Sequence, residues 1–484
     1  MAQGVCEAGR VRSWVVAVCL ALAACGDDDL EVTPDGGGID APAGDILEQL
    51  RGLAEVASVT ESTTDQAGYR YFEIQFDQPV DHANPGGPRF QQYATLIHKD
   101  VAAPMVLLHT GYGNWYYDFP GELTRLLGAN QIVVEHRFFR GSRPTGTAAW
   151  AHLTIEQSAA DHHRISDALH RIYRGRWLET GASKGGMTSI YHRRFYPDDV
   201  DGTVAYVAPQ SFGAPDYRYE PHLEQLGPPA CRQALRDLQA ELLRDRRAML
   251  EARAQSEAVN RGFLYTRITL PVAVESAVVA LEWSFWQYDG AARCAQVPAV
   301  TASDSLVWGF LSNTSPVSSS NDEDIAEFEA YYYQAEVELG YPGTMDDHLT
   351  GLTLYGPTDF EGTYPVGVTR PAWRAEPMTD VDVWVKAMGD GIVFLYGEWD
   401  PWSGGMFELG NAQDSLRVVA PQAPHGASIG DLVAVDQTAV LAKLEVWSGV
   451  TPDAGQLKRR SPVREPAKRV PPVIVRALQL NGRQ

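Results

Sequence analysis

Three residues in this chain could together perform nucleophilic catalysis: Ser183, Asp400 and His425. Ser183 stands in the segment Gly181–Gly185 (GASKG), after an apolar run typical of a strand and before a stretch compatible with a helix. A serine hydroxyl is a weak nucleophile that needs a general base, and the base needs an acid to orient it. The flanking glycines permit a sharp strand-to-helix turn that exposes the hydroxyl. The pattern predicts Ser183 as the nucleophile.

Asp400 and His425 follow Ser183 in the order acid, then base, which is the order used by hydrolases with this serine turn. Each comes after a short apolar run that is typical of a buried strand, where side chains at the strands' carboxyl ends meet. We therefore predict a catalytic triad of Ser183, Asp400 and His425. Glu398 is the rival acid, and a structural histidine is the alternative interpretation of His425.

An oxyanion hole requires two backbone donors. The N–H of Lys184, at the start of the helix after Ser183, is one candidate. The second is expected in the loop 109–114 (HTGYGN), whose glycines allow close backbone approach. We favour the Tyr112 N–H, with Gly111 or Gly113 as neighbours; a purely structural turn is the alternative.

Strand-like and helical patterns alternate along the chain, which predicts an α/β fold with a mostly parallel sheet, an α/β-hydrolase core. The expected strands are Tyr71–Phe76, Arg89–Lys99, Pro104–His109, Gln131–Glu135, Arg176–Gly181, Val200–Val207, Ile392–Tyr396 and Leu416–Ala420, and the expected helices of this core include Ile155–Tyr173 and Asp431–Val446.

The alternation stops at residues 214–388, which we expect to form a helical cap between two strands. Helical spacing is present in Pro229–Gln255, Val272–Trp286 and Asp322–Glu338. Such insertions cover active sites and restrict what enters. The catalytic domain then comprises residues 68–213 and 389–449, and 450–484 is a basic, disordered tail.

The first 25 residues are expected to form a lipoprotein signal peptide. Arg10 and Arg12 precede the apolar run Trp14–Ala24, which is too short to span a bilayer comfortably, and the run ends at Cys25, the expected lipidation site. Residues 26–67 would be a flexible tether and lead-in. We expect an exported protein, anchored to a membrane surface through Cys25 or secreted, with an ordinary signal peptide as the alternative.

Cysteine count and charge narrow the class further. Outside the signal region only Cys231 and Cys294 remain, and an exported chain favours their pairing as a disulfide, with two free thiols as the alternative. The net charge of −22 argues against a nucleic-acid partner. His162 and His163 are adjacent on a predicted helix and cannot face one ion together, so we expect no metal site and no cofactor.

Longer motifs give the chain a family resemblance. They are Phe76–His82 (FDQPVDH), His109–Tyr112 (HTGY), Glu135–Phe139 (EHRFF), Leu153–Gln157 (LTIEQ), Asp161–His163 (DHH), Thr180–Thr188 (TGASKGGMT), Tyr191–Val200 (YHRRFYPDDV), Asp400–Ser403 (DPWS) and His425–Ala427 (HGA). Together they resemble the peptidase S37 family of secreted prolyl tri/tetrapeptidyl aminopeptidases, serine peptidases of the α/β-hydrolase clan, over most of residues 70–445.

The resemblance implies a serine peptidase that releases tri- or tetrapeptides from free N-termini, preferably after proline. By position it places the triad on Ser183, Asp400 and His425. Two departures from the family pattern, Ala208–Gly213 (APQSFG) and Trp150–His152 (WAH), concern substrate preference and leave the triad intact.

An enzyme that acts on chain ends must recognise the substrate's α-ammonium group, for which a carboxylate is the natural partner. Glu135 and the acidic stretch Asp322–Asp324 are the candidates, although a salt bridge of Glu135 to Arg137 or Arg140 is the stronger interpretation. Trp402 could line a proline pocket or fill the core. An esterase on the same triad and a catalytically silent surface-binding lipoprotein are the competing functions, and the oligomeric state stays open.

Overall fold

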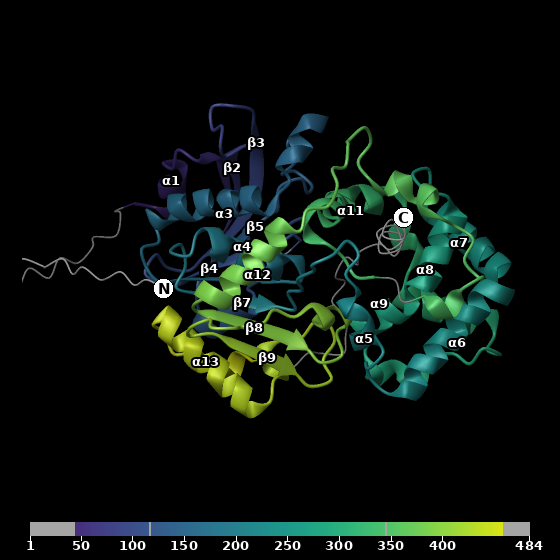
Figure 1. Ribbon diagram of the computed structural model, residues 1–484. Helices are drawn as coiled ribbons and strands as arrows, with labels where there is room; N and C mark the ends of the chain where they lie inside the picture. Colours follow the sequence, from purple (N-terminus) through teal and green to yellow (C-terminus); the bar gives the residue numbers. More distant parts are fainter. Residues whose placement is uncertain (1–43, 116–117, 344–345, 458–484) are drawn as a thin grey trace, which may run out of the picture. The chain divides into compact units, whose positions relative to one another are not determined.

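The computed structural model describes residues 44–115, 118–343 and 346–457 (Figure 1). In this part of the chain nine strands form one sheet in the order β1-β2-β3-β5-β4-β6-β7-β8-β9. The pairs β1–β2, β2–β3 and β3–β5 are antiparallel, and all later pairs are parallel. The strands are β1 Val56–Ser62, β2 Arg70–Pro79, β3 Arg89–His98, β4 Met105–His109, β5 Asn130–Val134, β6 Trp177–Ala182, β7 Gly202–Tyr206, β8 Ile392–Gly397 and β9 Leu416–Ala420.

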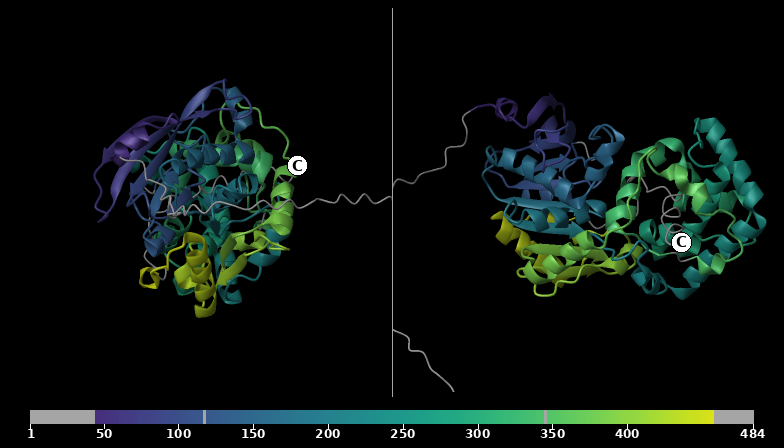
Figure 2. Two further views of the ribbon diagram at one scale, coloured as in Figure 1. Left: turned by 90° about the vertical axis from the view of Figure 1, so that its left-hand side faces the viewer. Right: turned by 45° about the horizontal axis from the view of Figure 1, so that its top comes forward.

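Helices cover both faces of this sheet (Figures 1 and 2). The central strands β4, β5 and β8 are buried along their whole length, as expected of parallel strands between two helical layers. One face packs against α3, α4 and α12, and the other against α2 and α13. These helices are α2 Glu122–Leu127, α3 Ile155–His170, α4 Lys184–Phe195, α12 Glu376–Met388 and α13 Ala434–Ser448. The layers confirm the predicted α/β-hydrolase fold.

A series of helices is inserted between β7 and β8. Two expected helices are each divided: the first breaks at Arg246 and the second at Ala280, whereas the third continues into a π-helical turn, Ala335–Leu339. The helices of the insertion are α5 Glu220–Leu223, α6 Pro229–Asp245, α7 Arg247–Arg261, α8 Leu270–Val279, α9 Leu281–Tyr288, α10 Asp304–Thr314 and α11 Asp322–Gln334.

The structure moves the expected end of the insertion. Helix α12 lies within residues 214–388, but it packs against α4 beside the sheet: the Tyr191 hydroxyl is 3.3 Å from the Met378 sulfur, and Arg194 pairs with Asp380. The layered core therefore resumes at Glu376, because α12 is the helix that precedes β8.

Both ends of the core also extend beyond the expected bounds. Helix α1 (Ile46–Arg51) and β1 belong to residues 26–67, predicted as tether and lead-in, yet Ile46 and Leu50 are buried and β1 pairs with β2. At the other end, the Asp453 N–H donates to the Leu126 carbonyl of α2, so the expected tail begins on the core. The structure does not describe the predicted signal segment with Cys25 or the residues after 457. Among the residues that it does describe, none of the helices has the length and hydropathy of a membrane span.

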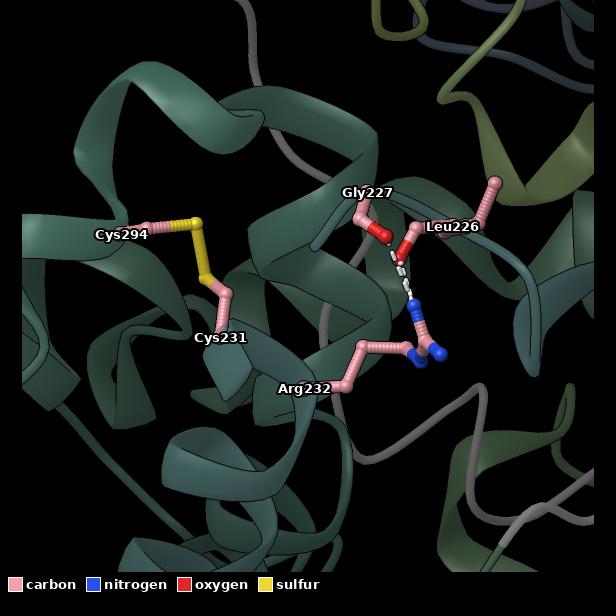
Figure 3. The surroundings of a disulfide bond; sticks show 5 residues. All are labelled: Leu226, Gly227, Cys231, Arg232 and Cys294. Carbon is pink, nitrogen blue, oxygen red and sulfur yellow. Dashed lines mark hydrogen bonds between the residues drawn. A yellow bond between two sulfur atoms is a disulfide. The ribbon is translucent and has the colours of Figure 1, made fainter. Parts of the chain in front are cut away.

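A disulfide joins Cys231 of α6 to Cys294, which follows α9 (Figure 3). The same figure shows Arg232, the next residue of α6, donating to the carbonyls of Leu226 and Gly227 at 2.6 and 2.8 Å. The start of α6 is thus tied both to the segment that precedes it and to the segment beyond α9.

Candidate active site

Ser183 lies at the turn between β6 and α4. Its backbone has φ 57° and ψ −126°, a conformation that residues other than glycine rarely adopt. Hydrogen bonds hold the turn on both sides: the Ser183 N–H donates to the Tyr206 carbonyl, and its carbonyl accepts from the Met187 N–H, each at 2.9 Å. The Ser183 side chain is partly exposed, which is the arrangement of a nucleophile elbow.

Glycines bring this turn into close contact with its neighbours. A Cβ on Gly181 would lie 2.3 Å from the Gly185 carbonyl oxygen, and a Cβ on Gly185 would lie 2.3 Å from the His109 carbonyl oxygen. Gly111 has φ 69°, and a Cβ there would lie 2.4 Å from the Gly185 nitrogen. Side chains cannot be accommodated at these positions, and the loop after β4 therefore lies directly against the first turn of α4.

The structure brings Asp400 and His425 together. The Asp400 Oδ2 and His425 Nδ1 are 2.7 Å apart, and the Asp400 side chain is completely buried. Asp400 Oδ1 accepts from the Trp402 N–H at 3.0 Å, which fixes the carboxylate plane. The other ring nitrogen of His425, Nε2, is buried and has no hydrogen-bond partner among the described residues. His425 therefore presents an oriented ring nitrogen that is free to accept a proton.

Glu398, the rival acid, and His348, a histidine of the insertion, both bond elsewhere. Glu398 is exposed, and its carboxylate accepts from the Gln422 N–H at 2.7 Å. Gln422 lies in the loop between β9 and His425. His348 bonds to Gln239 within the inserted helices, at 3.0 Å. Neither of these residues contacts the Asp400–His425 pair through a hydrogen bond in the described residues.

Inserted helices hold the loops that carry Asp400 and His425, the candidate acid and base. The His425 N–H donates to the Gln287 carbonyl of α9 at 3.0 Å. The His222 Nε2 of α5 lies 2.9 Å from the Asp400 carbonyl oxygen. One backbone bond to α9 and one side-chain bond from α5 thus fix both loops relative to the insertion.

The candidate oxyanion donors lie on the two segments that the glycines bring together. Lys184 is the first residue of α4, where backbone N–H groups have no partner within the helix. The Tyr112 N–H donates to Thr110 Oγ1 within its own loop, at a long 3.3 Å. The Gly111 N–H has no acceptor among the described residues. This geometry favours Gly111 over Tyr112 as the second donor.

The carboxylates considered for α-ammonium recognition serve the local structure. Buried Glu135 accepts from the Asn114 N–H at 2.9 Å and from the Ser142 N–H and hydroxyl at 3.1 and 2.8 Å. Burial raises the pKa of Glu135, against the effect of these bonds. Arg137 forms its ion pair with Asp161 at 2.7 Å and not with Glu135. Glu135 thus joins the loop after β4 to the loop at 142.

Two carboxylates of the acidic stretch on the insertion, those of Asp322 and Asp324, are used in the same way, whereas Glu323 is exposed. The Asp322 carboxylate accepts from the backbone N–H groups of Thr266 and Arg267, each at 2.9 Å. Asp324 accepts from the Asn321 side chain at 2.8 Å.

Aromatic side chains surround the acid and base loops. The Trp402 ring packs edge to face against Trp283 of α9 at 5.2 Å and against Tyr219 at 6.0 Å, and its centroid is 6.3 Å from that of His425. The Trp402 Nε1 is buried without a hydrogen-bond partner in the described part of the chain. In the loop after β4, Tyr112 packs against Phe328 of α11 at 5.8 Å.

A buried network that the sequence did not reveal lies behind the elbow. His109 Nε2 and His192 Nδ1 lie 2.8 and 2.7 Å from the same Glu179 oxygen, and these atoms fall within 4.8 Å of one another. His192 Nε2 also bonds to Asp199 at 3.0 Å, and His109 Nδ1 lies 2.8 Å from His162 Nδ1. The donor set could suit a metal ion, but each of these nitrogens already has a hydrogen-bond partner. His109, His162, His192 and Asp199 occur in the family motifs, and this is the signal that the sequence offers for them; Glu179 directly precedes the motif Thr180–Thr188.

Burial and charge together shift the pKa values of the residues in this network. Burial opposes protonation of His192, but the charges of Glu179 and Asp199 outweigh it and raise the His192 pKa to about 9. Burial also opposes ionisation of Glu179, yet the charge of His192 and the bonds from both histidines lower its pKa to about 2. Burial lowers the pKa of His109 and of His162, which favours their neutral forms. A buried ion pair of Glu179 and His192 therefore joins β6 to α4.

Comparisons with known proteins agree with the resemblance found in the sequence. The family model described as PS-10 peptidase S37 matches residues 40–468. The prolyl tri/tetrapeptidyl aminopeptidase of Streptomyces mobaraensis is 38% identical over 429 residues, which cover 88% of this chain and 89% of that protein. The lysosomal Pro-X carboxypeptidase of Homo sapiens is 27% identical over 185 residues, 33% of this chain and 36% of its own. Among solved structures, the proline iminopeptidase of Mycobacterium smegmatis matches 77% of this chain and 98% of its own, at 13% identity and a TM-score of 0.35.

Proposed function

Because the chain belongs to the peptidase S37 family and is a serine peptidase, we propose that it releases tri- and tetrapeptides from free N-termini, preferably after proline. Ser183 is the nucleophile, His425 the general base and Asp400 the acid that orients it. One observation carries the assignment: the buried Asp400 carboxylate lies 2.7 Å from His425 Nδ1 and leaves Nε2 without a partner among the described residues.

The proposed reaction begins when the Ser183 hydroxyl attacks the carbonyl carbon of the third or fourth residue of the substrate. His425 Nε2 takes the hydroxyl proton, and Asp400 stabilises the imidazolium that forms. The oxyanion is received by backbone N–H groups, that of Lys184 and, by preference, that of Gly111, with Tyr112 as its neighbour. His425 then gives the proton to the leaving amine, and water hydrolyses the acyl-enzyme with His425 again as base. The bond from Ser183 to His425 forms as the substrate binds, since catalytic hydrogen bonds often tighten only in the complex.

Trp402 supports the proposed preference for proline. Its ring lies within a group of aromatic side chains beside His425, and a pyrrolidine ring packs well on such faces. Trp402's neighbours Trp283 and Tyr219 belong to the inserted segment, so the insertion contributes to specificity. For the α-ammonium group, Glu135 is a poor candidate because it already accepts three hydrogen bonds.

We also propose export. The basic n-region, the short apolar run and Cys25 support a lipid anchor at a membrane surface, while the disulfide between Cys231 and Cys294 suits an oxidising compartment. Radiolabelled palmitate incorporation, compared between the native chain and Cys25→Ser, tests the anchor; equal incorporation contradicts it.

The decisive experiment compares products and labelling. Mass spectrometry of digests of a peptide that begins Ala-Ala-Pro should show release of the tripeptide from the free N-terminus and none from the acetylated form. Short p-nitrophenyl esters test the esterase alternative. If the protein hydrolyses the esters and no peptide, the proposed release of N-terminal peptides is refuted. A fluorophosphonate probe should label the native chain and leave Ser183→Ala unlabelled; equal labelling of both refutes the nucleophile.

A further inference from the structure

The side chain of Lys184, the residue after the nucleophile, is buried, although lysine is seldom found in protein interiors. Its Nζ donates to the Gly111 carbonyl at 2.7 Å, and the rings of Tyr112 and Phe139 lie 5.8 and 5.4 Å away. Burial lowers the pKa of Lys184 well below its usual range, so the location disfavours the charged form. A methionine would fill similar space without this penalty. The bond to Gly111 is therefore what lysine contributes here.

This bond controls the orientation of a peptide in the oxyanion loop. A trans peptide directs its C=O and N–H in opposite directions. When Nζ holds the Gly111 carbonyl, the Tyr112 N–H of the same peptide points away from Nζ, toward Thr110 Oγ1. Gly111 has φ 69°, and glycine is the residue least restrained about its own dihedrals. The hydrogen bond from Lys184 Nζ, which we call the tether, restrains the Gly111 carbonyl and so limits that freedom.

The tether also couples the two candidate donors. Gly111 packs against the backbone of Lys184 and Gly185, in the first turn of α4, which carries the Lys184 N–H. The backbone of Lys184 thus supplies one donor, and its side chain holds the loop that supplies the other. We propose that the Lys184 side chain is a positioning residue that holds the oxyanion loop in its productive orientation through the Gly111 carbonyl. This rests on the proposed function.

The test uses Lys184→Met, which removes the Nζ donor and keeps the backbone N–H. Removal of one oxyanion donor costs about 10²–10³ in kcat, so a donor displaced by loss of its tether should cost about 10–10²-fold, with KM within about twofold. The affinity of a tripeptide boronate ending in boroproline, which forms a tetrahedral adduct, should fall by the same factor. The affinity of the product Ala-Ala-Pro should not change. Lys386→Met is the matched control, since it removes a lysine bond on α12.

If Lys184 had a purely structural role, Lys184→Met would lower the melting temperature, and the ratio of boronate affinity to product affinity would not change. That result overturns the proposal, and so does a kcat of the variant within twofold of the native value. If Lys184→Met does not fold, Lys184→Arg keeps a donor at an altered reach and is subject to the same comparison. The fluorophosphonate labelling rate of Ser183 separates the two hypotheses. If the native chain labels quickly but cleaves no peptide, the proposed function fails, while slower labelling of the Met variant still supports the tether.

Discussion

The disulfide between Cys231 and Cys294 allows a quantitative prediction for stability. It closes a loop between residues 63 positions apart. Loop-closure entropy for that length is about −14 cal/mol/K, which corresponds to about 4 kcal/mol at 25 °C. The bridge lies in the compact unit Pro42–Gln484. With an unfolding entropy of about 2.1 cal/mol/K per residue, a change of 1 kcal/mol shifts the Tm of a unit of that size by about 1 °C. We predict that Cys231→Ser/Cys294→Ser lowers the Tm by about 4 °C.

The native contacts around the bridge should survive its removal. Arg236 of α6 pairs with the buried Glu282 of α9 at 2.9 Å. The Gln239 side chain donates to the Val278 carbonyl at 2.9 Å, and Gly227 lies against the ring of Trp286. Because these contacts hold α6 against α8 and α9 independently, we expect kcat at 25 °C to change by less than about twofold.

Differential scanning calorimetry with and without dithiothreitol provides the measurement and its control. Reductant should lower the Tm of the native chain toward that of the double serine variant and leave the variant itself unchanged. A double variant that melts within 1 °C of the native chain refutes the loop-entropy reasoning. A large loss of kcat at 25 °C shows instead that the bridge is needed to hold α9, and with it the base loop.

Further predictions concern the elbow, the triad and the buried network. Gly185→Ala places a Cβ 2.3 Å from the His109 carbonyl oxygen and should destabilise the fold by about 1–3 kcal/mol, measured by urea unfolding, and slow fluorophosphonate labelling; unchanged labelling contradicts this close packing. Asp400→Asn should lower kcat by about 10⁴-fold with little change in KM, and a loss below tenfold removes Asp400 from the triad. The His192 pKa of about 9 lies above its ordinary value, so its charge stabilises the fold below about pH 6.5 and this contribution disappears as pH rises through 9. His192→Gln should abolish that alkaline loss in unfolding experiments, and an identical pH profile refutes it.

The sequence predicts the central fold because its strands have a simple pattern. Runs such as those of β4 and β8 are continuously apolar, since both faces are buried between helices. The edge strand β1 was missed because only Val59 of its seven residues is buried, and the segment otherwise has the polar composition of a linker. The break at Arg246 was also missed, because helical spacing continues on both sides of it.

The elements of the site show the same limit. Ser183, Asp400 and His425 could be proposed from local motifs, since each follows a strand and their order along the chain is informative. The bond of Lys184 to Gly111 spans 73 residues, and that of His109 to Glu179 spans 70. Such pairs depend on which strands become neighbours in the sheet, and no local pattern in the sequence encodes that.

The inserted helices bond to both proposed catalytic loops: Gln287 of α9 to the His425 loop and His222 of α5 to the Asp400 loop. This has a consequence for engineering the enzyme's specificity. The segment that we propose contributes to substrate specificity also supplies backbone and side-chain anchors for the proposed catalytic groups. Replacing the whole insertion with that of a relative would therefore exchange substrate choice and remove two supports of the proton-transfer machinery in one step. A chimera should keep α5 and α9 from the host chain and graft only the helices between and beyond them.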